Sequence, residues 1–123
     1  MKILIDTHIF LWSLSEPEKL GIERIHMLET RANTIYVSAI SIAEIIIKIS
    51  LKKLNIPTIT SRMIEEIGFE ELDFTAKSAD LLKDLPWHHR DPFDRMLICQ
   101  ALSYGYPIMT DDLKFTAYGC TIA

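Results

Sequence analysis

The segment from His88 to Ala101 contains the acidic residue whose setting most suggests chemistry. Asp91 has the position of a helix N-cap and Pro92 that of the first helical residue, because proline lacks the N–H that a first turn leaves unpaired. Asp94 then falls in the first turn, ahead of a largely apolar run that predicts a helix buried against a sheet. Taken alone, this carboxylate could simply complement the helix dipole. Acids elsewhere in the chain must decide whether it also belongs to a site.

The elements that must position such acids alternate between strands and helices. Apolar, β-branched runs predict strands at residues 2–5, 34–37, 69–72 and 107–109, with a further strand at 120–122. Helical patterns cover residues 7–14, 22–31, 40–53, 61–67, 75–85 and 92–104. This alternation predicts a single domain, residues 1–123, of class α/β: three layers, α/β/α, around an open, mainly parallel sheet of four to five strands.

Parallel α/β architecture brings distant acids to one edge of the sheet. Each helix returns antiparallel to the strands, so helix N-termini lie beside strand C-termini, where ligands bind in this architecture. Asp6 and Asp112 follow predicted strands, whereas Glu44 and Asp94 are expected in the first turns of returning helices. We therefore expect all four carboxylates to face the same edge.

A cluster of carboxylates predicts a cation. Each acid has a local interpretation: Asp6 could cap a helix, Glu44 could form a capping box with Ser41, and Asp112 could shape a turn. A common site explains them together, and because like charges repel, such a site needs a neutralising ion. Oxygen ligands suit Mg²⁺ or Mn²⁺. A net charge of −4 is the wrong sign for nucleic-acid binding by bulk electrostatics, and a bound cation would let this acidic protein approach a phosphodiester.

Composition places few further demands on the chain. Its 123 residues can bury a core without disulfide or metal staples. Cys99 and Cys120 have no close spacing, which fits a reducing cytosol, and we interpret both as inert thiols. The N-terminus turns acidic at Asp6, unlike a signal peptide, and charged residues interrupt the most apolar run. We expect a soluble cytoplasmic protein without a membrane segment.

Four segments, in order, resemble the PIN-domain family. They are Leu4–His8 (Leu-Ile-Asp-Thr-His), Ser38–Glu44 (Ser-Ala-Ile-Ser-Ile-Ala-Glu), His89–Arg95 (His-Arg-Asp-Pro-Phe-Asp-Arg) and Thr110–Phe115 (Thr-Asp-Asp-Leu-Lys-Phe). The resemblance spans the whole chain. It looks closest to the VapC-like toxins of prokaryotic toxin-antitoxin pairs.

The resemblance implies a Mg²⁺- or Mn²⁺-dependent ribonuclease that acts on single-stranded RNA and is restrained by a small antitoxin protein. The residues that match the family's acidic set by position are Asp6, Glu44, Asp94 and Asp112. Asp111 leaves the fourth ligand open, although the family's Thr-x-Asp spacing favours Asp112. Thr110 would supply a hydroxyl that supports a ligand rather than the metal.

Basic residues near these acids are candidates for contact with substrate phosphates. Arg90 and Arg95 flank the acidic segment, and Arg95 could instead form a surface pair with an acid. Lys48 lies four residues after Glu44, either as its ion-pair partner on the same helix face or as a cation near RNA.

Histidines and tryptophans have weaker interpretations. His88 and His89 are adjacent and cannot easily face one metal ion, so we do not expect a zinc site and place them beside the phosphates. Trp12 and Trp87 could stack on bases, but we favour core packing for both.

Two other functions share parts of this pattern. An aspartate-based phosphatase or phosphotransfer domain also begins with an aspartate after its first strand, but needs a second aspartate where this chain has His8. A non-catalytic RNA-binding or interaction module is the other alternative, and four acids without cations would bind RNA poorly.

An apolar content of 49% suggests a covered surface. The early helices carry Phe10, Leu11, Trp12 and Met27, a patch that a second copy or an antitoxin segment would cover. We therefore expect a homodimer as well as an antitoxin partner.

Overall fold

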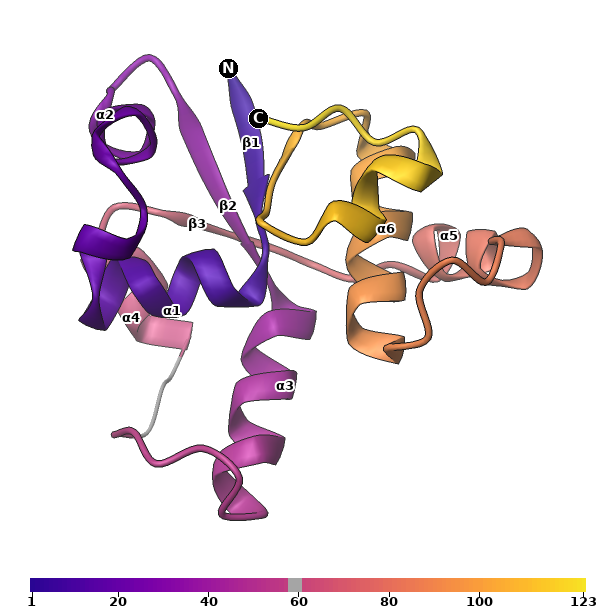
Figure 1. The fold of residues 1–123 in the computed structure, drawn as a ribbon, viewed down its shortest axis with the longest axis horizontal. Helices are drawn as coiled ribbons and strands as arrows, with labels where there is room; N and C mark the ends of the chain where they lie inside the picture. The colour runs from indigo at the N-terminus through magenta and orange to yellow at the C-terminus, as the bar shows by residue number, and fades with distance from the viewer. Residues whose placement is uncertain (58–60) are drawn as a thin grey trace.

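Four parallel strands form an open sheet between helices in the computed structural model, which describes residues 1–57 and 61–123 (Figure 1). The strands are β1 (Lys2–Ile5), β2 (Thr34–Ser38), β3 (Glu70–Leu72) and β4 (Ile108–Met109). Their order is β3-β2-β1-β4, and every pairing is parallel. The predicted α/β class and its parallel sheet are confirmed.

Helices cover both faces of this sheet. They are α1 (Thr7–Ser15), α2 (Ile22–Glu29), α3 (Ala39–Ser50), α4 (Ser61–Glu66), α5 (Ala76–Ala79) and α6 (Pro92–Tyr104), with 3₁₀ turns η1 (Pro17–Lys19), η2 (Asp80–Asp84) and η3 (Leu113–Tyr118). Helices α1, α2 and α4 lie on one side of the sheet, and α5 and α6 lie on the other (Figure 1). Within the described residues, no helix is both long and apolar enough to cross a membrane.

The central strand β1 separates two apolar cores. Ile3 and Ile5 pack into the cluster under α1, whereas Leu4 packs into the cluster formed with α6. All three side chains are fully buried, because successive residues of a strand point to opposite faces and both faces are covered. The sheet thus fixes Asp6, the next residue, at a rigid strand end.

Two predicted elements differ from the structure. Residues 120–122 form no fifth strand but a single parallel bridge between Ile122 and Ile108, because β4 is only two residues long and offers little to pair with. The helix predicted from Thr75 to Leu85 is the short α5 followed by η2. Pro86 explains its end, because a residue before proline is disfavoured in helical conformation.

The predicted apolar patch on the early helices and the predicted core position of Trp87 also differ from the structure. Phe10 is fully buried, and its three expected companions, Leu11, Trp12 and Met27, pack half-buried against the same core. The predicted core position of Trp12 therefore fits, but that of Trp87 is wrong, since Trp87 is 74% exposed.

Candidate metal centre

Helix α6 begins as predicted and presents Asp94 at the sheet edge. The Asp91 carboxylate accepts hydrogen bonds from the backbone N–H groups of Phe93 (2.8 Å) and Asp94 (3.3 Å), so the predicted N-cap is confirmed. Pro92 occupies the first turn, and Gly105 ends the helix in the left-handed conformation with φ of 70°. Because the cap uses Asp91, the Asp94 carboxylate is free to point away from the helix.

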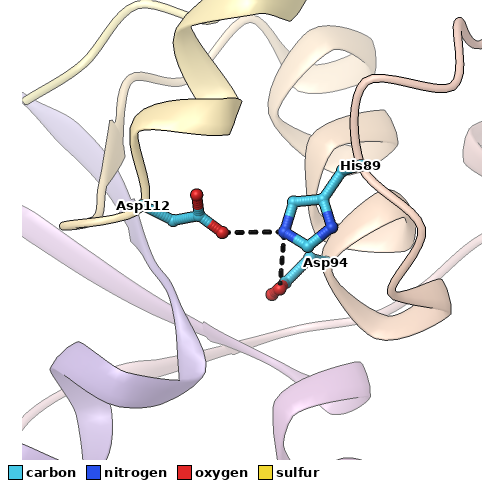
Figure 2. A group of neighbouring side chains, drawn as sticks. All are labelled: His89, Asp94 and Asp112. Carbon is cyan, nitrogen blue, oxygen red and sulfur yellow. Dashed lines mark hydrogen bonds and ion pairs between the residues drawn. The ribbon is translucent and has the colours of Figure 1, made fainter.

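Asp94 meets two side chains from other elements. His89, from the loop before α6, places Nε2 3.1 Å from Asp94 Oδ2 and 2.7 Å from Asp112 Oδ2 (Figure 2). Asp112 comes from the turn after β4, so three separate segments supply this group. One ligand atom from each residue lies within 4.8 Å of the other two, a spacing that a single metal ion could bridge.

The His89 ring is held in a defined orientation. Its Nδ1 accepts the backbone N–H of Asp91 at 3.2 Å, so the proton of a neutral ring lies on Nε2 and points at the two carboxylates. The His89 backbone N–H donates to the Tyr118 hydroxyl at 2.7 Å, which itself donates to the Pro86 carbonyl at 2.7 Å. The imidazole therefore acts as a fixed bridge between Asp94 and Asp112.

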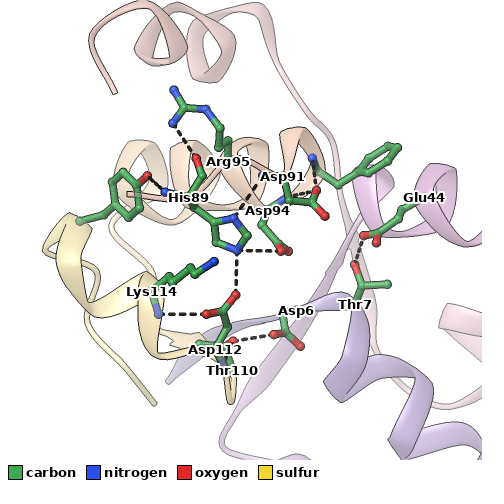
Figure 3. A network of polar contacts seen from close by, with 12 residues as sticks. Asp6, Thr7, Glu44, His89, Asp91, Asp94, Arg95, Thr110, Asp112 and Lys114 are labelled. Carbon is green, nitrogen blue, oxygen red and sulfur yellow. Dashed lines mark hydrogen bonds and ion pairs between the residues drawn. The ribbon is translucent and has the colours of Figure 1, made fainter. Parts of the chain in front are cut away.

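A threonine links Asp112 to Asp6. The Thr110 hydroxyl donates to Asp6 Oδ2 at 2.5 Å and accepts the Asp112 backbone N–H at 3.0 Å (Figure 3). Asp6 Oδ1 accepts the Ile9 N–H at 2.8 Å, which caps α1. Asp6 is only 4% exposed, Thr110 joins it to the Asp112 backbone, and both Asp6 oxygens keep unused lone pairs.

Glu44 reaches the same edge from α3, one turn later than predicted. It lies in the second turn of that helix, because the helix begins at Ala39, and it is 3% exposed. It forms no capping box with Ser41. Its Oε1 accepts the Thr7 hydroxyl at 2.9 Å and its Oε2 pairs with Lys48 Nζ at 2.6 Å. The Glu44 carboxylate raises the pKa of Lys48, so this lysine is the ion-pair partner rather than a free cation.

The electrostatics of the cluster centre on Asp94. Burial, together with the neighbouring carboxylates of Asp91, Glu44 and Asp6, raises the pKa of this carboxyl to about 7 against a lowering by His89. Burial also raises the pKa of Asp6. Burial opposes ionisation of Asp112 too, but the Lys114 N–H and the His89 ring lower its pKa below the usual value. Among these carboxylates, Asp94 therefore lacks enough positive charge nearby to stabilise its ionised form.

The adjacent Asp111 and Asp112 lie in different settings. Asp111 forms an ion pair with Arg24 at 2.5 Å, and Arg24 also donates to the Thr110 carbonyl at 3.0 Å. Asp112 instead bonds to His89. The structure thus places Asp112 rather than Asp111 beside Asp94, which is the choice that the spacing favoured.

Arg95 lies in neither setting expected for it. It is 4% exposed, and its guanidinium donates to the carbonyls of Leu85, Pro86 and His89 at 2.8 to 3.1 Å. A helix residue next to Asp94 points inward, toward the loop that returns along α6, so it cannot reach a substrate phosphate. Arg90, by contrast, is exposed.

His89 lies inside the site and not beside substrate phosphates, where its sequence position predicted it. Its adjacency to His88 suggested two phosphate-facing side chains, but His89 is 7% exposed whereas His88 is exposed. The available signal was its position two residues before an N-cap, since a ring there can accept the cap residue's N–H and turn toward the first helical turn.

The donor set fits a hard divalent cation. Carboxylates from four elements, Asp6, Glu44, Asp94 and Asp112, gather at one edge, and the His89 ring donates to two of them rather than offering a free nitrogen (Figure 3). Burial and the charges of Asp91, Glu44 and Asp6 raise the pKa of Asp94, and a cation would favour its ionised form. Oxygen-rich sites of this kind suit Mg²⁺ or Mn²⁺.

Comparison with known proteins places this geometry in context. A family model described as PIN domain matches residues 3–119. DNA-bound VapBC from Salmonella typhimurium has a TM-score of 0.69 and 19% identity, over 100% of this chain and 97% of that chain. VapBC2 from Rickettsia felis, bound to a DNA fragment from its promoter, has a TM-score of 0.65 and 17% identity, over 99% and 96%. The PIN domain endonuclease Utp24 has a TM-score of 0.51 and 20% identity, over 94% and 74%. No curated protein matches the sequence.

Proposed function

This chain belongs to the PIN-domain family, and we propose that it is a Mg²⁺- or Mn²⁺-dependent endoribonuclease that hydrolyses single-stranded RNA. One observation carries the proposal. Asp94 is a half-buried carboxylate whose pKa of about 7 reflects burial and three neighbouring acids, at the edge where α/β sheets bind ligands. Perturbed carboxyl groups that converge in this way mark functional sites.

Asp94 and Asp112 are the residues that would hold the ion, with Asp6 and Glu44 beside them. The ion would lower the pKa of a bound water and offset charge on the phosphate in the transition state. A carboxylate of the cluster that is not bound to the ion would accept the proton of the attacking water. His89 keeps Asp94 and Asp112 at a fixed separation.

Some residues support this chemistry without touching the substrate. Thr110 fixes Asp6, and Thr7 together with Lys48 fixes Glu44. Among the basic candidates we assign only Arg90 to the RNA backbone, because it is exposed, whereas Arg95 is buried and Lys48 is paired.

We further propose that the protein is the toxin of a toxin-antitoxin pair, acts in the cytoplasm as a homodimer, and is restrained by a small antitoxin. The full-length likeness to chains of VapBC complexes supports the antitoxin, and two free thiols suit a reducing compartment. Exposed apolar side chains, including Ile22 at 87% and Leu113 at 83%, leave surface for partners.

No observation favours phosphotransfer through Asp6. Such a nucleophile needs an accessible oxygen, but Asp6 is 4% exposed and both of its oxygens accept hydrogen bonds. We keep a phosphatase substrate only as a control.

The adjacent aspartates offer a matched test. Purified protein is incubated with single-stranded RNA and Mn²⁺, with chelator, and as the Asp112→Asn and Asp111→Asn variants. We expect cleavage only with the ion, a loss of about 100-fold or more in Asp112→Asn, and near-normal rates in Asp111→Asn. Wild-type cleavage that persists in excess chelator, or turnover of p-nitrophenyl phosphate in place of RNA, would refute the proposed function.

A further inference from the structure

Trp87 is a large apolar side chain that stands in solvent. It belongs to the loop between η2 and α6 and is 74% exposed. The guanidinium carbon of Arg95 lies 3.6 Å from the centroid of its ring, so one face of the indole is covered by a cation. An exposed tryptophan fixed in this way is a ready stacking surface.

The support under Trp87 is rigid. Nη1 of Arg95 donates to the carbonyls of Pro86 (2.8 Å) and His89 (3.1 Å), and Nη2 donates to that of Leu85 (3.0 Å). A guanidinium held at three points keeps its plane, and the indole that rests on it loses little further freedom when a ligand stacks on its other face.

A cavity of about 370 Å³ opens beside the indole. Leu82, Pro92 and Met96 give it apolar walls, whereas Lys83 and Arg90 are exposed where they line it. An apolar slot with an aromatic wall and cations at its rim matches a nucleotide, whose base is flat and whose phosphate is negative.

The cavity and the candidate metal centre share one segment of chain. Arg95 holds the His89 carbonyl, while the His89 ring contacts Asp94 and Asp112. Pro92 lines the cavity two residues before Asp94. Pro92 and Arg95 line the cavity from another side of the first turn of α6 than Asp94, so a strand with one base in the cavity would pass around the start of α6 to place a phosphate at the carboxylates.

We propose that this cavity binds one unpaired base of the RNA substrate, stacked on Trp87, with neighbouring phosphates near Lys83 and Arg90. The inference rests on the proposed function and adds a site that positions the strand. Local cations are needed because the net charge of −4 opposes RNA binding elsewhere. A cavity of this size holds a single planar group, whereas a stable protein partner needs a far larger surface.

Binding can be measured separately from cleavage. In an Asp94→Asn background, which stops hydrolysis, fluorescence anisotropy of a labelled ten-nucleotide single-stranded RNA gives the affinity in the presence of Mn²⁺. We expect Trp87→Ala to weaken binding by roughly 5- to 100-fold and Trp87→Phe, which keeps an aromatic face, by much less. An abasic oligonucleotide of the same length should bind weakly to the parent and be insensitive to Trp87→Ala. Lys83→Gln should weaken both oligonucleotides alike.

The outcomes separate this inference from the proposed function. Equal RNA affinity with and without Trp87, or no measurable binding, overturns the base site, and wild-type cleavage then still supports the nuclease. If Trp87→Ala no longer co-purifies with a small co-expressed antitoxin but binds RNA as tightly as the parent, the cavity belongs to a protein partner and the inference is overturned. If the wild type cleaves no RNA, the nuclease proposal fails, while Trp87-dependent affinity would still support the base site.

Discussion

Asp94 and Arg95 are neighbours on α6, yet the fold surrounds the Arg95 charge with acceptors and the Asp94 charge with other carboxylates. Arg95 is buried, and its cation is satisfied by three carbonyls and an indole face. Asp94 faces carboxylates, and only the His89 ring among its main influences lowers its pKa. The Arg95 charge therefore stabilises the fold, whereas the Asp94 charge lacks a full counter-charge within the described part of the protein. A carboxylate in such a setting is typical of a ligand site.

The largest effect should come from removing the unsatisfied charge. Asp94→Asn keeps the side-chain shape and removes one of the repelling carboxylates, so the metal-free fold should be as stable as the wild type or more stable. RNA cleavage should fall by about 100- to 10,000-fold. Cleavage rates and chemical denaturation in chelator check both statements. A destabilised variant that cleaves RNA normally would reduce Asp94 to a helix-dipole residue.

Removing the Arg95 charge should instead destabilise the fold. Arg95→Met leaves the buried carbonyls of Leu85 and His89 without their donor, whereas Pro86 keeps the Tyr118 hydroxyl, and should lower the free energy of unfolding by about 3 kcal/mol or more. Arg90→Met is the matched control, since Arg90 is exposed, and it should change stability by less than about 0.5 kcal/mol. Urea denaturation of both variants measures this contrast, and equal stability of the two would contradict it.

The two regions should also respond differently to pH. The pKa of Asp94 is about 7 in the folded protein against 3.8 as its ordinary value, so the folded state binds more protons between these limits. The metal-free protein should therefore lose stability as pH rises from about 4 to 7 through this group, and the raised pKa of Asp6 acts in the same direction. Melting temperatures at pH 5 and 8 in chelator test the sign. Asp94→Asn should show a flatter slope, and Mn²⁺ should reverse the trend because it binds ionised carboxylates.

The smallest expected effect concerns Asp91, the N-cap of the helix that carries Asp94 and Arg95. Asp91→Ala removes the acceptor for the Phe93 and Asp94 N–H groups and should cost about 1 kcal/mol of stability. Folded protein should keep most of its cleavage activity, and loss of the Asp91 charge should lower the pKa of Asp94. Denaturation midpoints and cleavage by the folded fraction check this. A drop in activity as large as that of Asp94→Asn would show that Asp91 itself acts in the site.

Local patterns predicted the parts of the fold that depend on local rules. Strand β1, the Asp91 cap, the first helical residue Pro92 and the Gly105 end of α6 follow from residue types at fixed offsets. The carboxylate edge followed from topology, because parallel strands bring their ends together. The bridge at Ile122 did not, since pairing there depends on how short β4 becomes.

Side-chain direction was harder to predict than position. Whether Arg95 turns toward substrate or interior depends on the carbonyls of a loop that the sequence pattern does not place. The same loop turns His89 inward and Trp87 outward, reversing what adjacency and apolar character suggested. These contacts depend on how the loop packs against α6, and the periodicity of the sequence does not predict them.

Binding of Mn²⁺ to metal-free protein reports on the candidate metal centre itself and needs no assumption about the RNA target. Isothermal titration is carried out above pH 7, where Asp94 is ionised in the folded protein, on the wild type, Asp94→Asn and the control Asp111→Asn. We expect binding in the wild type, unchanged affinity in Asp111→Asn, and a loss of roughly 10- to 100-fold or more in Asp94→Asn. Equal affinity in the wild type and Asp94→Asn, or no binding in the wild type, would contradict a metal centre at this edge of the sheet.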